Sequence, residues 1–237
     1  MAVPFSAIAD NLQAVRARIE AAARRAGRDP AGITLIAVSK TFDSDHVRAA
    51  WEAGQREFGE NKVQEAEQKT TATSGLAGAR WHLIGHLQSN KAKKAAAIFS
   101  AVHSVDSVEL VRRLDAAAAE QGTAPELLVQ VDLAGEATKF GAGEPDIEAI
   151  AHAALAARAA RLAGLMILPP WNENQEETRP WFVRLRQLRD RLISVGIPAA
   201  SLRHLSMGMS HDFEAAIEEG ATMVRVGTAI FGHRVKH

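Results

Sequence analysis

Apolar residues follow two different rhythms along this chain. Between Ile8 and Ile19 they recur every three or four positions, which is the spacing of one face of an α-helix. Ser6 stands where the N-cap of such a helix is expected, and Pro30 ends the pattern. The segment 1–30 is therefore predicted to form a leading helix.

From residue 33 onward, short apolar runs rich in β-branched residues alternate with amphipathic stretches of about ten residues or more. The runs lie at 33–39, 56–59, 81–85, 101–105, 127–133, 162–168, 203–208 and 223–227. Alternating strands and helices are typical of parallel strands joined by right-handed crossovers. Eight such units within 33–232 predict an α/β fold, a single (β/α)8 TIM barrel with an extra N-terminal helix.

A doubly wound open sheet is the alternative fold. Such a sheet normally carries a glycine-rich phosphate turn after its first strand. Here the first predicted strand continues into SKTFDSD (39–45), and no G-x-G-x-x-G motif lies near it. A chain of 237 residues also suits one α/β barrel of up to ~250 residues. The sequence therefore favours a single barrel domain over 1–237.

Composition narrows the classes of function. The chain has 28 Lys+Arg and 28 Asp+Glu, so no positive excess suggests a nucleic-acid partner. It has no Cys, so a disulfide or a Cys-ligated metal is excluded, and no Tyr, so no phenol can act as acid or base. Its most apolar stretch, 162–171, is about half the ~20 residues of a membrane span. We expect a cytoplasmic protein without membrane or nucleic-acid partners.

Two further groups are weighed as sites and set aside. His82 and His86 are four residues apart across a strand end, but no third ligand has a metal-site spacing, so no metal is expected. Lys91, Lys93 and Lys94 lie near a predicted helix start. They are predicted to form a solvated helix face rather than an anion-attracting mouth.

In a barrel of this type the chemistry lies at the carboxyl ends of the strands. Lys40 follows the first predicted strand. Partial desolvation there lowers an amine pKa, and such an amine can form a Schiff base with a carbonyl. The alternative is a surface lysine at a strand end. Trp81, on the third predicted strand, is the one tryptophan expected near this mouth, whereas Trp171 is expected to pack against helices or loops.

Small and hydroxyl-bearing residues follow the last two predicted strands. Ser206, Gly208 and Ser210 precede one helix, and Gly227 and Thr228 begin another. Helix N-termini favour anions, so these residues predict a phosphate site. The alternative is that Ser210 and Thr228 only cap helices.

An amine and a phosphate site together suit pyridoxal 5′-phosphate (PLP), whose aldehyde and phosphate lie at opposite ends of one small ring. A sugar-phosphate aldolase would use the same two groups through a Schiff base. These residues alone leave both possibilities open.

Several long motifs resemble those of the pyridoxal phosphate homeostasis protein family. They are AVSKT (37–41), FGENKVQEA (58–66), WHLIGHLQSNK (81–91), HSVDS (103–107), LLVQVDLAGEATKFG (127–141), GLMILPP (164–170) and the segment LSMGMSHDFEAAIEEGATMVRVGTAIFG (205–232). The resemblance covers nearly the whole chain. It implies an alanine-racemase-type barrel that holds PLP as an internal aldimine and takes part in intracellular PLP homeostasis, affecting amino-acid and keto-acid metabolism. It implies no established catalytic turnover.

Residue by residue, the resemblance implies that Lys40 carries the cofactor and that Arg225 faces the pyridine nitrogen. Ser206, Gly227 and Thr228 would hold the phosphate. Because a guanidinium only donates hydrogen bonds, the facing pyridine nitrogen must accept and stay unprotonated. Such a ring is a weaker electron sink, which suits a carrier without catalytic residues.

Three further positions follow from the same resemblance. Asn61 would lie on the ring side of the pocket. Lys139 matches a lysine common in the family and would accept PLP transiently. Phe42 and Asp43 stand where the family usually has a basic residue and Pro, which puts any accessory role of a lysine there in doubt.

Three functions then remain. The first is a monomeric, non-catalytic PLP carrier, with PLP-dependent apoenzymes as candidate recipients. The second is a PLP enzyme with weak amino-acid racemase-type activity. The two-base mechanism of related racemases, which recruits a Tyr from a second β domain, is not available to a chain without Tyr. The third is a Schiff-base lyase acting on a phosphorylated sugar without PLP.

Overall fold

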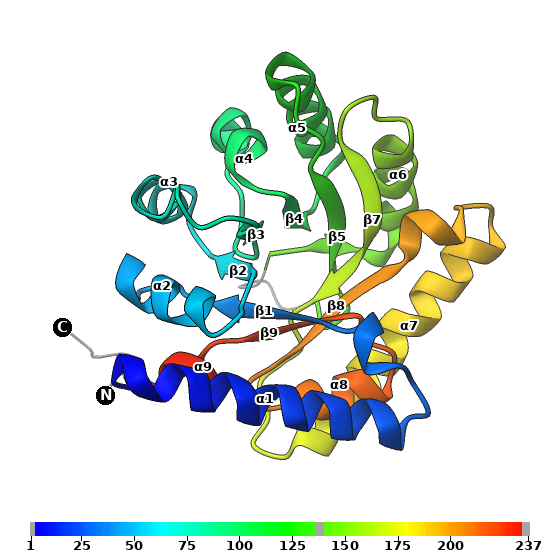
Figure 1. Cartoon of the computed structure of the whole chain (residues 1–237). Coiled ribbons are helices and arrows are strands. Elements are labelled where there is room, and N and C mark those ends of the chain that lie inside the picture. The colour runs from blue at the N-terminus through cyan, green and yellow to red at the C-terminus, as the bar shows by residue number, and fades with distance from the viewer. Residues whose placement is uncertain (1–2, 136–139, 234–237) are drawn as a thin grey trace.

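A ring of parallel strands forms the centre of the molecule in the computed structural model, which describes residues 3–135 and 140–233 (Figure 1). The strands of the ring are β1 (Thr34–Val38), β2 (Glu57–Glu60), β3 (Arg80–Leu83), β4 (Ala101–Val105), β5 (Glu126–Asp132), β7 (Arg161–Ile167), β8 (His204–Met209) and β9 (Met223–Val226). Pairing of β1 with β9 and of β4 with β5 closes the ring. The predicted eight-stranded barrel is confirmed. A two-residue strand, β6 (Ala142–Gly143), adds to β5 and was not predicted.

Helices follow the strands and cover the outside of the ring (Figure 1). They are α1 (Phe5–Arg25), α2 (Ser44–Glu52), α3 (Val63–Ala72), α4 (Ala92–Ile98), α5 (Val108–Gln121), α6 (Glu144–Leu155), α7 (Arg179–Ser194), α8 (Phe213–Glu218) and α9 (Thr228–Phe231). Apolar side chains on their inner faces meet the outward-facing side chains of the strands in the main core. Within the described ranges, no helix is both long and apolar enough to cross a bilayer.

The extra N-terminal helix α1 packs against α2, α8 and α9 (Figure 1). The predicted apolar face is confirmed, since the residues from Ile8 to Ile19 that carry it are buried. The predicted N-cap is wrong: α1 begins at Phe5, and Ser6 lies inside its first turn. Pro4 precedes the helix in an extended conformation, and its carbonyl accepts the N–H of Ala7. The proline backbone therefore starts the helix without a side-chain cap.

The approach of β7 to β8 requires glycine at position 164. A Cβ added to Gly164 would lie 1.9 Å from the carbonyl oxygen of His204, its partner in the pairing. Because the obstacle is backbone, no side-chain rotation relieves the clash. We expect Gly164→Ala to lower the free energy of unfolding by about 3 kcal/mol or more, the upper range for overpacked cores.

Urea denaturation of purified protein measures this effect. Gly75→Ala is the matched control, because an added Cβ there meets nothing within 4 Å. A wild-type midpoint for Gly164→Ala would contradict the close pairing of β7 with β8.

The interior of the barrel is partly polar. A small apolar cluster, which includes Ile36, Leu128 and Met166, fills part of it. Buried polar side chains from the strands occupy other positions; they include His82, His103, Gln130, Ser206 and Arg225. This polar interior leads to the pocket at the carboxyl ends of the strands.

Candidate functional site

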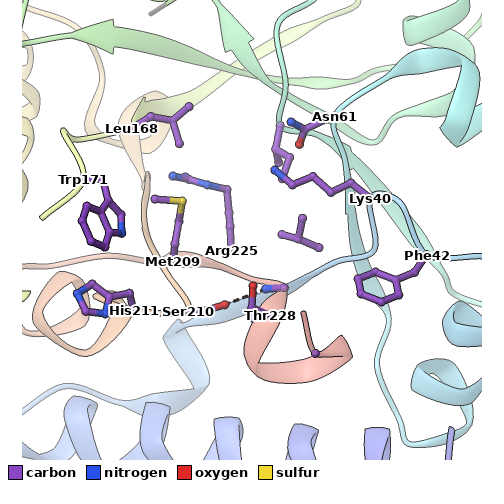
Figure 2. A pocket seen from close by; sticks show the side chains of 14 residues that line it. Lys40, Phe42, Asn61, Leu168, Trp171, Met209, Ser210, His211, Arg225 and Thr228 are labelled. Carbon is purple, nitrogen blue, oxygen red and sulfur yellow. Dashed lines mark hydrogen bonds between the residues drawn. The ribbon is translucent and has the colours of Figure 1, made fainter. Parts of the chain in front are cut away.

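A cavity of about 290 Å³ opens at the carboxyl ends of the strands. This volume is near the lower end for small-molecule sites. Figure 2 shows Lys40 and Asn61 on one side, Trp171 and His211 on the other, and Arg225 between them. Five of the six predicted site residues line the cavity. They are Lys40, Asn61, Arg225, Gly227 and Thr228.

Lys40 follows β1 and is half-buried. The residues that flank it are held by a buried ionic cluster of Lys69, Glu60 and Glu65. Lys69 Nζ donates to the Ser39 carbonyl at 2.7 Å, to Glu60 Oε1 at 2.7 Å and to Glu65 Oε1 at 2.8 Å. Ser39 Oγ also donates to Glu60 Oε1 at 2.7 Å. The cluster therefore fixes the backbone before Lys40.

Thr41, after Lys40, is held by the same cluster. Its φ of 71° is the only positive φ of a non-glycine residue in the described ranges. Its N–H donates to Glu65 Oε1 at 2.5 Å. Sequence reasoning missed Lys69, although Glu60, directly after the predicted strand at 56–59, was a signal that a buried cation is needed nearby. Burial raises the pKa of Glu60, and the charge of Lys69 opposes that rise.

Arg225 projects from β9 and is 3% exposed. Its Nη2 donates to the carbonyl of Ile167 at 2.8 Å, and its Nη1 donates to Ser206 Oγ. Burial lowers the pKa of this guanidinium to about 10, while the carboxylate of Asp212 opposes the change. Arg225 therefore remains a cation at neutral pH and presents only donors.

Ser206 does not line the cavity with the other predicted residues. Its side chain is 0% exposed and bonds to Arg225 and to His103 in the barrel interior. The register of β8 against β9 shifts between Ser206 and Met209, so side-chain alternation does not carry through to the end of the strand. Ser210, beyond this irregularity, lines the cavity instead. The geometry gives no support to a contact between Ser206 and a bound phosphate.

Ser210, Gly227 and Thr228 form a set of anion donors at the start of α9. Ser210 Oγ accepts the N–H groups of Gly227 at 3.1 Å and of Ala229 at 3.4 Å (Figure 2). Ser210, on the loop that follows β8, thus caps the N-terminus of α9. The same N–H groups and the two hydroxyls are the donors that a phosphate takes.

Aromatic residues on the loop after β7 complete one wall. Trp171, 71% exposed, lines the cavity and stacks on His211 with ring centroids 6.3 Å apart. Trp81 is buried and packs on Phe58 at 5.4 Å. The prediction for these two tryptophans is therefore wrong. Trp81 belongs to the core between strands and helices, whereas Trp171 follows Pro169 and Pro170 on a loop that reaches the mouth.

The remaining candidates lie away from the cavity lining. Lys93 and Lys94 are exposed and pair with Glu120 and Glu67, as expected for a solvated helix face. His82 is buried in the barrel, and no cluster of three metal-ligating side chains occurs among the described residues. Lys139 lies outside the described residues.

Comparison with known proteins identifies the fold family of the chain. Residues 11–235 match the family model of the alanine racemase N-terminal domain. Alanine racemase of Clostridium difficile is 16% identical with a TM-score of 0.70, over 96% of this chain and 58% of that one. This distant likeness concerns the fold alone. The closed barrel with a lysine and an arginine in its mouth thus has the architecture of the alanine racemase N-terminal domain.

Nearer relatives cover the whole fold. The pyridoxal phosphate homeostasis protein of Pseudomonas aeruginosa is 46% identical over 234 residues, and that of Escherichia coli K12 is 40% identical over 229. Each alignment spans at least 96% of this chain and 97% of the relative. PipY of Synechococcus elongatus, solved with PLP bound, is 40% identical with a TM-score of 0.84 over 95% of this chain and all of that one. The chain belongs to the pyridoxal phosphate homeostasis protein family.

Proposed function

We propose that this protein binds PLP in the cavity at the barrel mouth and serves intracellular PLP homeostasis as a non-catalytic carrier. One observation carries the proposal: Lys40, Arg225 and the donors of Ser210 and Thr228 line a single cavity. An amine, a fixed cation and a phosphate cradle match the three polar ends of PLP. When bound, PLP supplies an aldehyde that an amine can attach and a ring that can accept electrons.

Each residue would hold one part of the ligand. Lys40 would attach the aldehyde carbon, and Asn61 would lie beside the ring. Gly227 and Thr228, together with Ser210 rather than Ser206, would donate to the phosphate. At Gly227 an added Cβ would lie 3.2 Å from the carbonyl oxygen of Val38, so glycine permits the close approach of β1 to the start of α9.

Arg225 supports a carrier rather than an enzyme. It is a buried cation that only donates hydrogen bonds, so a pyridine nitrogen facing it stays unprotonated. An unprotonated ring stabilises a carbanion poorly, which disfavours racemase-type chemistry. The chain also contains no Tyr to serve as a second base. A cytoplasmic monomer that passes PLP to apoenzymes of amino-acid and keto-acid metabolism is the form of this proposal that the sequence favours.

Titration with PLP tests the proposal. We expect a visible absorption band that borohydride bleaches, with the label mapping to Lys40. A protein that takes up no PLP would refute both PLP functions and favour the sugar-phosphate lyase. Rapid exchange of amino-acid α-protons in deuterated water would instead support racemase-type activity and contradict the carrier.

The phosphate donors can be tested separately. We expect Ser210→Ala to weaken PLP binding about 10-fold to 100-fold, the range for a lost hydrogen bond to a charged group. Pyridoxal, which lacks the phosphate, should bind the variant and the wild type equally. Dissociation constants for both ligands measure the difference.

Ser206→Ala is the matched control for Ser210→Ala. Because Ser206 bonds to Arg225, this variant should weaken PLP and pyridoxal by the same factor. A loss confined to PLP in Ser206→Ala would assign Ser206 to the phosphate after all.

A further inference from the structure

A line of hydrogen-bonded side chains crosses the barrel interior behind Arg225. Ser206 Oγ lies 2.8 Å from His103 Nδ1. His103 Nε2 lies 2.9 Å from His82 Nδ1, and His82 Nε2 lies 2.7 Å from Glu57 Oε2. The five residues come from β2, β3, β4, β8 and β9. Both imidazoles and Ser206 are at most 1% exposed, whereas Glu57 begins β2 at the opposite end of the barrel from the cavity.

The groups at the two ends of the line determine its direction, that is, which atom donates and which accepts in each hydrogen bond. A carboxylate only accepts, so His82 Nε2 must carry the proton that meets Glu57. A neutral His82 then accepts at Nδ1 from His103 Nε2–H, and a neutral His103 accepts at Nδ1 from the Ser206 hydroxyl. Ser206 Oγ is left with lone pairs for Arg225 Nη1, which only donates. Each hydrogen bond of the line thus has one donor and one acceptor. The assignment satisfies both the carboxylate of Glu57 and the guanidinium of Arg225.

We propose that His82 and His103 are positioning residues for Arg225: as neutral Nε2–H tautomers they join the guanidinium at the cavity to the carboxylate of Glu57 and fix the donors that face a bound ring. Neither imidazole lines the cavity, so both act through Ser206 and Arg225. The part of this inference that concerns the ring rests on the proposed PLP function. The tautomers assigned to His82 and His103 do not depend on that function.

The surroundings of His103 favour a neutral ring. Burial lowers the pKa of His103 well below its ordinary value, and the charge of Arg225 acts in the same direction. At the far end of the line, Arg80 Nη1 lies 3.5 Å from Glu57 Oε1.

Three other charged groups lie near the line. Glu126 lies 3.8 Å from His204 and pairs with Arg203, and Asp212 faces Arg225. Among the described residues, the hydrogen bonds of the two imidazole rings are those of the line itself.

The first test uses the protein without cofactor. Long-range proton–nitrogen NMR correlations of histidine-labelled protein report the tautomer of each ring. We expect His82 and His103 both to be neutral with the proton on Nε2 at pH 7. A proton on Nδ1 of either ring, or a charged ring, would overturn the proposal. Because no PLP is present, this result is separate from the success or failure of the proposed function.

The second test measures what the line does for the cavity. His103→Leu removes both contacts, and we expect pyridoxal and PLP each to bind about tenfold more weakly, with a shifted absorption band of the bound ligand. His103→Gln, which keeps an acceptor and a donor, should recover part of both effects. His204→Gln changes a neighbouring histidine outside the line and should leave the band unshifted.

The outcomes separate positioning from simple structural support. A folded His103→Leu protein with wild-type affinity and an unshifted band would refute the positioning role. If His103→Leu does not fold, His103→Gln decides: because its rescue is partial, we expect its band to be shifted from that of the wild type, and an unshifted band would refute the role. A wild-type protein that binds no PLP refutes the proposed function, and the NMR result then decides the direction of the line.

Discussion

Replacing Lys40 with alanine is expected to abolish the visible absorption band of the PLP-loaded protein and the borohydride-stable label. Lys40, two residues after β1, lines the cavity, so its loss removes the amine proposed to attach the aldehyde. Weak PLP binding should remain, because the phosphate donors at Ser210, Gly227 and Thr228 are untouched. Absorption spectra and the PLP dissociation constant measure both effects.

Lys94→Ala is the matched control for Lys40→Ala. Lys94 is exposed and pairs with Glu67, away from the cavity lining, so its loss should leave the band intact. A label that persists in Lys40→Ala and maps to another lysine would contradict the attachment site. If Lys40→Ala binds PLP no better than a variant that also carries Ser210→Ala, the phosphate assignment is wrong.

Lys69→Met is expected to lower the free energy of unfolding by about 3–5 kcal/mol, the usual loss when one partner of a buried ion pair is removed. The substitution leaves Glu60, at 0% exposure, without the cation that bonds its Oε1. Oε2 of Glu60 already has no hydrogen-bond partner among the residues that the structure describes. Urea denaturation of the cofactor-free protein measures the loss.

The pH dependence of this loss follows from Glu60. Burial raises its folded pKa above the ordinary value of 4.5, so the folded state binds more protons than the unfolded state above that pH. Stability therefore falls as pH rises through the folded pKa. Without Lys69 to oppose the shift, the loss in Lys69→Met should be larger at pH 8 than at pH 5.

Glu60→Gln combined with Lys69→Met provides the control for this prediction. The double variant has no uncompensated carboxylate at position 60, so it should recover part of the stability and lose most of the pH dependence. A single Lys69→Met variant within about 0.5 kcal/mol of the wild type would contradict the importance of the cluster.

The strands and the barrel were predictable because most strands are short apolar runs bounded by polar residues. The finer placement of the site was not. The register of β8 against β9 becomes irregular after Ser206, so the alternation of side chains along the strand does not extend beyond it. Sequence position alone therefore could not show that Ser210 lines the cavity and Ser206 does not. Whether the loop that carries Trp171 extends to the cavity likewise depends on packing between elements distant in sequence.

The polar residues behind the site were visible in the sequence but were not interpreted. His103 interrupts the apolar run at 101–105, and Glu60 directly follows the run at 56–59. Such interruptions predict that a buried polar group has a partner. They do not predict which partner: that of His103 is Ser206, 103 positions away on β8, whereas that of Glu60 is Lys69 on α3.

The polar line through the barrel also bears on how the chain folds. Its residues run from Glu57 in β2 to Arg225 in β9, and the contact of His103 with Ser206 spans 103 positions. A half-barrel made of β1–β4 would bury the imidazoles of His82 and His103 while Ser206 of β8, the partner of His103, is not yet in place. Ring closure is therefore expected to be cooperative and late, with a high contact order, and no stable folding intermediate should contain β1–β4 alone.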